Sequence, residues 1–132
     1  MAARGVSPTE GEMTTTRFVF TELHASDVHK ARAFYAALLG WEYTEVLGVA
    51  DYALIHSSGA TFGAVAAAKP GASSWLAYVG VDDVEAATAR ARALGATIEV
   101  ECRVFSRFGT LSVIIDPVGA RVGLWQEASR KA

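Results

Sequence analysis

The sequence lacks what several large protein classes require. It holds one cysteine, Cys102, in 132 residues, which excludes an intrachain disulfide and a cysteine-rich metal centre. Its 12 basic and 14 acidic residues give a net charge of −2, so no surplus of positive charge favours a nucleic-acid partner. No apolar run is long enough to span a membrane, and residues 1–16 lack the apolar core of a signal peptide. We therefore expect a cytoplasmic protein with neither nucleic acid nor membrane as partner.

What the sequence does have is typical of a globular domain. Its residues are 52% hydrophobic and 20% charged, and 132 residues suffice to bury one core. We expect a single domain over residues 17–127, preceded by a disordered polar tail at 1–16 and followed by a short tail at 128–132.

An internal repeat is the strongest pattern. Residues 51–65 align with residues 111–125 at an offset of 60 without a gap, and Gly59 and Gly63 fall on Gly119 and Gly123. Each copy reads as an apolar strand, a turn with glycine and a second strand. This pattern predicts one β-hairpin in each half of the chain.

The segments that precede the two hairpins also match. Strands are predicted at 18–25 and 74–81, each followed by a helix with apolar residues at helical spacing, then strands at 41–46 and 97–101. Asp82, with Glu85 three residues later, is a candidate helix cap. Residues 102–110 are either a lid or a plain connection. The order βαβββ therefore occurs twice, in module 1 (about 17–68) and module 2 (about 73–127).

Three sequence segments resemble those of a known family. "SDVHKARAFYAALLGWEY" and "VDDVEAATARARALGA" resemble the two helices of the vicinal oxygen chelate superfamily (glyoxalases, bleomycin-resistance proteins and dioxygenases), and "IIDPVGARVGLWQ" resembles its closing hairpin. Within it, the chain is most similar to a bacterial group of predicted lactoylglutathione lyase-related proteins. The resemblance implies an α+β fold in which two tandem βαβββ modules form a cup-shaped mixed sheet with flanking helices, and a homodimer.

The resemblance also marks four positions where metal-using relatives carry a His, Glu or Gln ligand. Two of them lie seven residues before the aspartate that opens each helix and hold Phe20 and Leu76; the hairpin positions hold Gly63 and Gly123. None of these side chains offers a ligand atom, whereas such sites need imidazole or carboxylate groups. We therefore expect neither a metal nor another cofactor.

Strand alternation predicts the side chains that line the cup. They are mostly apolar and aromatic with a few polar groups, which is the composition of a small-molecule pocket. Phe20 and Trp125 could alternatively belong to the core. The predicted ligand-binding residues are Phe18, Phe20, Asp51, Gly63, Leu76, Val113, Arg121, Gly123 and Trp125.

Glu22 is the candidate catalytic residue. It shares a strand face with Phe20, and a desolvated carboxylate there can serve as a general acid or base. Tyr78, its partner in the repeat, could share a proton or orient a carbonyl. The alternative interpretation is structural, with Glu22 paired to Arg121 or bonded to a nearby amide.

Three functions follow from these features. The first is metal-independent binding of a small, mostly apolar organic molecule. The second is a metal-independent isomerase, cyclase or lyase that acts on a carbonyl compound with Glu22 as acid or base. The third is a metal-dependent glyoxalase-like enzyme, which the ligand positions disfavour. The sequence leaves open which molecule is bound and whether it is turned over.

Overall fold

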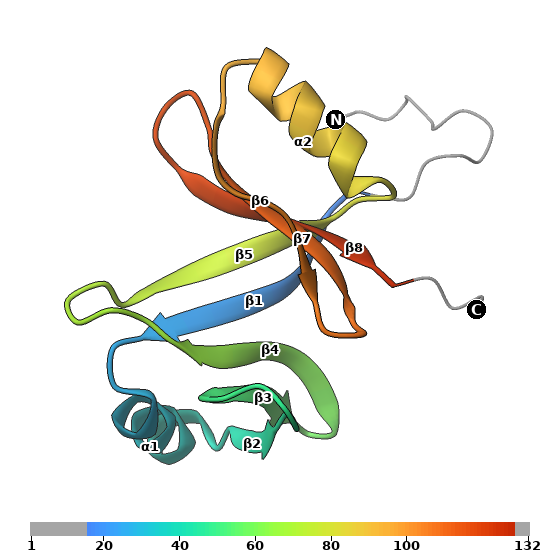
Figure 1. Ribbon diagram of the computed structural model, residues 1–132. Helices are drawn as coiled ribbons and strands as arrows, with labels where there is room; N and C mark the ends of the chain where they lie inside the picture. The colour runs from blue at the N-terminus through green and yellow to red at the C-terminus, as the bar shows by residue number, and fades with distance from the viewer. Residues whose placement is uncertain (1–15, 129–132) are drawn as a thin grey trace, which may run out of the picture. The chain divides into compact units, whose positions relative to one another are not determined.

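The computed structural model describes residues 16–128 and divides into two compact units (Figure 1). Residues 19–78 form one, here called the N-terminal unit; residues 79–128, with 16–18, form the other, the C-terminal unit. Along the chain the elements follow the order βαβββ twice, so the predicted α+β class with two tandem modules is confirmed. Except for residues 16 and 128, the two predicted tails lie outside the described residues.

The N-terminal unit is a mixed sheet with one helix. Its strands lie in the order β2-β3-β4-β1-β5, with β1 and β4 parallel and the pairs β2–β3 and β3–β4 antiparallel. Residues of β5 up to Tyr78 belong to this unit. Its elements are β1 (Phe18–Ala25), α1 (Val28–Leu39), β2 (Glu42–Glu45), β3 (Tyr52–Ser57), β4 (Ala60–Ala67) and β5 (Ser74–Gly80).

Local sequence sets both ends of α1 and the face that it covers. The Asp27 side chain accepts a hydrogen bond from the backbone N of Lys30, and Gly40 ends the helix in the left-handed conformation at φ 74°. Helix α1 lies against the sheet over a core in which β1, β3 and β4 each take part (Figure 1). The buried members of this core are Leu23, Ala25, Ile55 and Val65.

The C-terminal unit repeats this arrangement with an antiparallel sheet. Strands β8, β7 and β6 are neighbours, and the backbone N of Val81 bonds to the carbonyl of Trp125 in β8. Val84, Ile114 and Leu124 form its buried core. Its elements are α2 (Val84–Ala93), β6 (Thr97–Phe105), β7 (Gly109–Ile115) and β8 (Arg121–Glu127).

Two local predictions about this unit were wrong. Asp83, not Asp82, caps α2: its side chain accepts from the backbone N of Ala86. Residues 102–110 are not a plain connection, because β6 continues to Phe105 and β7 begins at Gly109, which makes the segment a β-hairpin. The strand stays continuous past an irregularity between Val100 and Arg103, where Cys102 adopts a left-handed φ of 46°.

No helix among residues 16–128 is long and apolar enough to cross a membrane.

Candidate functional site

The most unusual group in the N-terminal unit is the Glu22 carboxylate. Glu22 is 8% exposed and lies between Thr21 and Leu23 on β1. Because Leu23 packs toward α1, alternation along the strand places Glu22 on the opposite face of the sheet. That face is here called the Glu22 face. It holds the most deeply buried charged residue of the described chain.

Three side chains hold this carboxylate. The hydroxyl of Tyr78 donates to Oε1 over 2.9 Å, and the hydroxyl of Tyr52 donates to Oε2 over 2.8 Å. The Nε2 atom of His24, two residues along β1, lies 2.8 Å from Oε1. Strands β1, β3 and β5 therefore each contribute to one hydrogen-bonded group, here called the Glu22 cluster (Glu22, His24, Tyr52 and Tyr78).

Apolar side chains border the Glu22 cluster. The rings of Phe20 and Tyr78 are 6.5 Å apart between centroids and tilted by 56°. Leu76 precedes Tyr78 by two residues on β5, shares its face, and is 1% exposed. In such surroundings a buried charge is stable only when hydrogen bonds replace those it loses to water.

Both phenols of the cluster are buried and act as donors. Burial raises the pKa of Tyr52, and the neighbouring Glu22 carboxylate raises it further, by its charge and by the hydrogen bond. Tyr52 therefore keeps its proton at neutral pH and remains a donor to Glu22. Tyr78 is 4% exposed and binds the other carboxylate oxygen.

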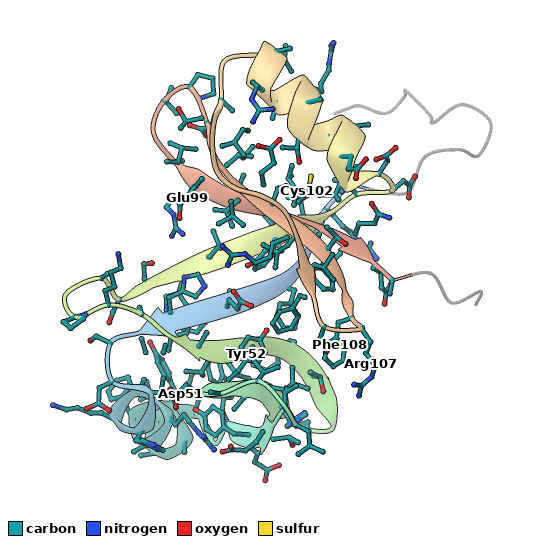
Figure 2. All side chains as sticks on the ribbon, in the orientation of Figure 1. Asp51, Tyr52, Glu99, Cys102, Arg107 and Phe108 are labelled. Carbon is teal, nitrogen blue, oxygen red and sulfur yellow. The ribbon has the colours of Figure 1, made fainter. Side chains whose placement is uncertain are left out.

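Tyr52 is the member that sequence reasoning missed. It begins β3, whereas the predicted residue Asp51 lies one position earlier in an exposed turn with a φ of 53° (Figure 2). Asp51 and Tyr52 are neighbours in the sequence, so strand alternation from the predicted residue Asp51 assigns Tyr52 to the opposite face. In the structure Ile55 packs toward α1, so Tyr52 and Leu54 share the Glu22 face.

Gly63 is also on the other face from the one predicted. A Cβ atom built on it would meet the backbone carbonyl of Thr21 and would lie 3.6 Å from Cδ1 of Ile55. Both neighbours are on the α1 side of β1 and β3. The close approach of two backbones, rather than of a ligand, explains this glycine.

The predicted residues of the C-terminal unit share one face of its sheet. Ile114 and Leu124 pack toward α2, so Val113 and its register partner Gly123 point the other way. Trp125 and Arg121 follow on that face of β8. Both Nε and Nη2 of Arg121 donate to the Glu99 carboxylate over 2.9 Å. Phe18, at the start of β1, is 66% exposed.

The metal positions of the family have no suitable donors in either unit. Phe20 and Leu76 are hydrocarbon side chains, and Gly63 and Gly123 have none. Within residues 16–128, no group of three or more His, Cys, Asp or Glu residues is placed to hold a metal ion. The residues present do not fit the divalent ion that such a site would hold.

A family model described as a glyoxalase-like domain matches residues 18–124. The chain belongs to this family. Two curated proteins, both named "Putative glyoxylase CFP32", from Mycobacterium bovis and Mycobacterium tuberculosis, are each 32% identical to it over 115 residues. These matches cover 81% of the chain and 44% of each relative, so the chain spans under half the length of those proteins. The predicted membership of the vicinal oxygen chelate superfamily is confirmed.

Solved structures similar to this glyoxalase-like chain support the fold. The Mn(II)-bound glyoxalase from Novosphingobium aromaticivorans has a TM-score of 0.61 at 19% identity, covering 89% of this chain and 43% of that one. Homoprotocatechuate 2,3-dioxygenase from B. fuscum (H200Q variant) has a TM-score of 0.64 at 20% identity, covering 86% and 33%. Methylmalonyl-CoA epimerase from Mycobacterium tuberculosis has a TM-score of 0.63 at 17% identity, covering 86% and 89%. At these identities the likeness concerns fold, not activity.

Proposed function

We propose that this glyoxalase-like chain binds a small, mostly apolar organic molecule without a metal, and that the ligand contacts the Glu22 face. One observation carries the proposal: a carboxylate that is 8% exposed is held by two phenols beside the apolar side chains of Phe20 and Leu76. A few fixed polar groups among apolar side chains are the usual make-up of a small-molecule site. Phe20 and His24 keep part of their surface exposed, so a ligand has side chains to contact.

The donor set supports the metal-free part of the proposal. A divalent ion in this fold needs several imidazole or carboxylate ligands that converge from different strands. At the family's positions on β1 and β5, this chain has Phe20 and Leu76, and Gly63 on β4 faces α1. The Glu22 carboxylate is itself already bonded to Tyr52, Tyr78 and His24.

A binding screen in a chelator tests this function. Ligand-observed NMR with neutral and charged aromatic compounds, in buffer with EDTA, should find binders, and calorimetry should give the same affinity with and without EDTA. Phe20→Ala should weaken binding by about tenfold, because it removes apolar contact area on the Glu22 face. The matched control is Phe34→Ala, which truncates a phenylalanine on α1 that is 57% exposed.

Either of two results would contradict the proposal. An absence of binders across the panel would remove small-molecule binding as the function. Affinity that disappears in EDTA and returns with an added metal ion would remove its metal-free part.

A second candidate, metal-independent acid–base catalysis, has its own observation. His24, Glu22 and Tyr78 form a continuous hydrogen-bonded row, and such a row can accept a proton at one end and release it at the other. Glu22 would take a proton from the carbon next to a carbonyl and return it, which needs no oxidant or reductant.

Exchange of carbon-bound protons tests this second function. Acetophenone in deuterated water should exchange its methyl protons faster with the wild-type chain than with Glu22→Gln. Glu45→Gln, which changes an exposed carboxylate paired with Arg32, should leave the exchange rate unchanged. Equal rates for the wild type and Glu22→Gln would exclude Glu22 as the base.

A further inference from the structure

We propose that the ligand of the Glu22 face is an organic cation, a protonated amine on an aromatic body, whose N–H donates to Oε2 of Glu22. This inference rests on the proposed function and adds the chemical class of the ligand. Charge, acceptor capacity and ring placement around Glu22 each support it.

The first observation concerns charge. The exposed carboxylates Glu45, Glu99 and Glu101 each bind a guanidinium group, from Arg32, Arg121 and Arg92 respectively. Their side chains are 73%, 38% and 53% exposed, whereas that of Glu22 is 11% exposed. Thus the carboxylate that most needs a cation is bonded to two neutral phenols and an imidazole. His24 brings a positive charge to Glu22 only when its ring is protonated, whereas a cationic ligand would bring a charge of its own.

The second observation concerns acceptor capacity. Each carboxylate oxygen can accept about two hydrogen bonds. Oε1 is occupied by Tyr78 and His24, whereas Oε2 accepts one bond, from Tyr52. The remaining direction on Oε2 can be used by an N–H or O–H group but not by a carbonyl or carboxylate. An anionic ligand would in addition be repelled by Glu22.

The third observation concerns the aromatic rings. Tyr52 and Tyr78 both reach the carboxylate with their hydroxyl groups, and the Phe20 ring lies 6.5 Å from that of Tyr78. A cation beside Glu22 would therefore lie near the hydroxyl ends of the two phenols, with an aromatic ring, Phe20, close by for the apolar part of the ligand. An aromatic body on the amine would contact the exposed part of Phe20. The Glu22 face is therefore expected to prefer cationic ligands, whereas a metal site prefers ligands with anionic oxygen atoms.

Three probes with one skeleton separate the possibilities: 2-naphthylmethylamine, 2-naphthylmethanol and 2-naphthoate are cationic, neutral and anionic at pH 7.5. Titrations of the whole chain in EDTA, followed by ligand-observed NMR, should give the amine at least a tenfold lower Kd than either other probe. The amine and the alcohol can both donate to Glu22, so this ratio of about tenfold measures the added attraction between the ammonium charge and the carboxylate. The wild-type ranking decides the charge class of the ligand.

Two variants then locate the preference. Glu22→Gln should reduce the amine's advantage over the alcohol to about threefold or less, because the charge is removed while Gln retains an oxygen acceptor. Glu45→Gln, the matched control, should leave the ratio unchanged, because that carboxylate is exposed and bonded to Arg32. Circular dichroism verifies that each variant is folded.

The failures of the two proposals are distinguishable. If the alcohol or the naphthoate binds as tightly as the amine, small-molecule binding stands and the cationic class is wrong. If none of the three probes binds, this inference fails, and the proposed function fails with it only when the wider aromatic panel also contains no binder. An unchanged preference in folded Glu22→Gln would also overturn the assignment to Glu22.

Discussion

The Tyr52 hydroxyl donates a hydrogen bond of 2.8 Å to Oε2 of Glu22, from a residue 30 positions away in the sequence. The bond joins β3 to β1, which are separated in the sheet by β4. It therefore fixes the register of three strands as well as the orientation of the carboxylate. Because both residues are buried, the energetic consequences of this bond are measurable.

Removal of the Tyr52 hydroxyl should destabilise the chain. In Tyr52→Phe the buried carboxylate loses one of its donors, and we expect the free energy of unfolding to fall by about 1–3 kcal/mol. Urea denaturation measures this change. The control is Tyr43→Phe, which removes a half-buried hydroxyl bonded at 3.1 Å to the carbonyl of Arg32 and should cost under about 1 kcal/mol. Equal losses in both variants would mean that burial of Glu22 adds nothing to the value of the bond.

Stability should also decline at alkaline pH. Burial and the Glu22 carboxylate raise the pKa of Tyr52, so the folded chain keeps this proton at a pH where the unfolded chain loses it. The stabilisation is thus complete below about pH 10 and is lost as the pH rises toward the folded pKa. We expect the free energy of unfolding to fall by up to about 1.4 kcal/mol per pH unit above about pH 10.

Urea midpoints between about pH 9 and pH 11 measure this slope in the wild type and in Tyr52→Phe. Burial also raises the pKa of Tyr43, so a shallower slope should remain in the variant. Identical slopes would show that Tyr52 titrates in the folded chain as it does in the unfolded one.

The order of the elements could be predicted from the sequence because local signals determine it. The strand at 18–25 matches the structure, and a helix follows each of the strands predicted at 18–25 and 74–81. The pairing of Glu22 with Tyr78 also followed from local alternation, since both lie on strands that run straight into a helix. These features depend on periodicity and capping within a few residues.

The side chains of β3 and β4 that face each side of the sheet could not be predicted, because a short turn and a β-bulge in this hairpin compensate for each other in length. The first hairpin pairs Ser57 with Ala60 across a two-residue turn, and its register skips Phe62. The second closes a wider turn between Asp116 and Ala120. The first hairpin has a turn one residue shorter than that of the second, and the bulge at Phe62 adds one residue back. The two hairpins are therefore equal in length, and their sequences align at an offset of 60 without a gap.

The core residues show that the true offset is smaller by one. Ile55 and Val65 pack toward α1 as Ile114 and Leu124 pack toward α2, an offset of 59. A slip of one residue moves every side chain of a strand to the opposite face. The alignment at an offset of 60 therefore assigned Gly63 to the wrong face and missed Tyr52, whereas Val113 and Gly123 lie on the face away from α2.

Gly63 should be required for stability rather than for ligand approach. In Gly63→Ala the new methyl group would collide with the Thr21 carbonyl, and parting the two strands should cost about 1–3 kcal/mol. Gly71→Ala is the control: it has a left-handed φ of 80° and open space around it, so it reports backbone strain alone, at about 1 kcal/mol. Unchanged stability with weakened ligand binding in Gly63→Ala would instead return this glycine to the binding site.

The chain should not hold a stoichiometric metal ion. Untagged protein offered Zn²⁺, Mn²⁺, Ni²⁺, Fe²⁺ and Co²⁺ and then dialysed should contain well below one ion per chain by elemental mass spectrometry. The reason is chemical: the family's positions on β1 and β5 hold Phe20 and Leu76, and Ala64, the register partner of Glu22 on β4, also has no ligand atom.

If the chain does hold a metal ion, Glu22 and His24 are the expected ligands. They are the acidic and imidazole groups nearest the family's position on β1, and they lie 2.8 Å apart. One tightly held ion per chain, lost in a variant that combines Glu22→Gln with His24→Gln, would make both residues ligands. The Tyr52 and Tyr78 hydroxyls would then orient a metal-bound carboxylate, as hydrogen-bond partners of metal ligands commonly do. Metal-dependent chemistry of the glyoxalase type would become the function to test, and the preference for a cationic ligand would disappear, because the ion would already balance the charge of Glu22.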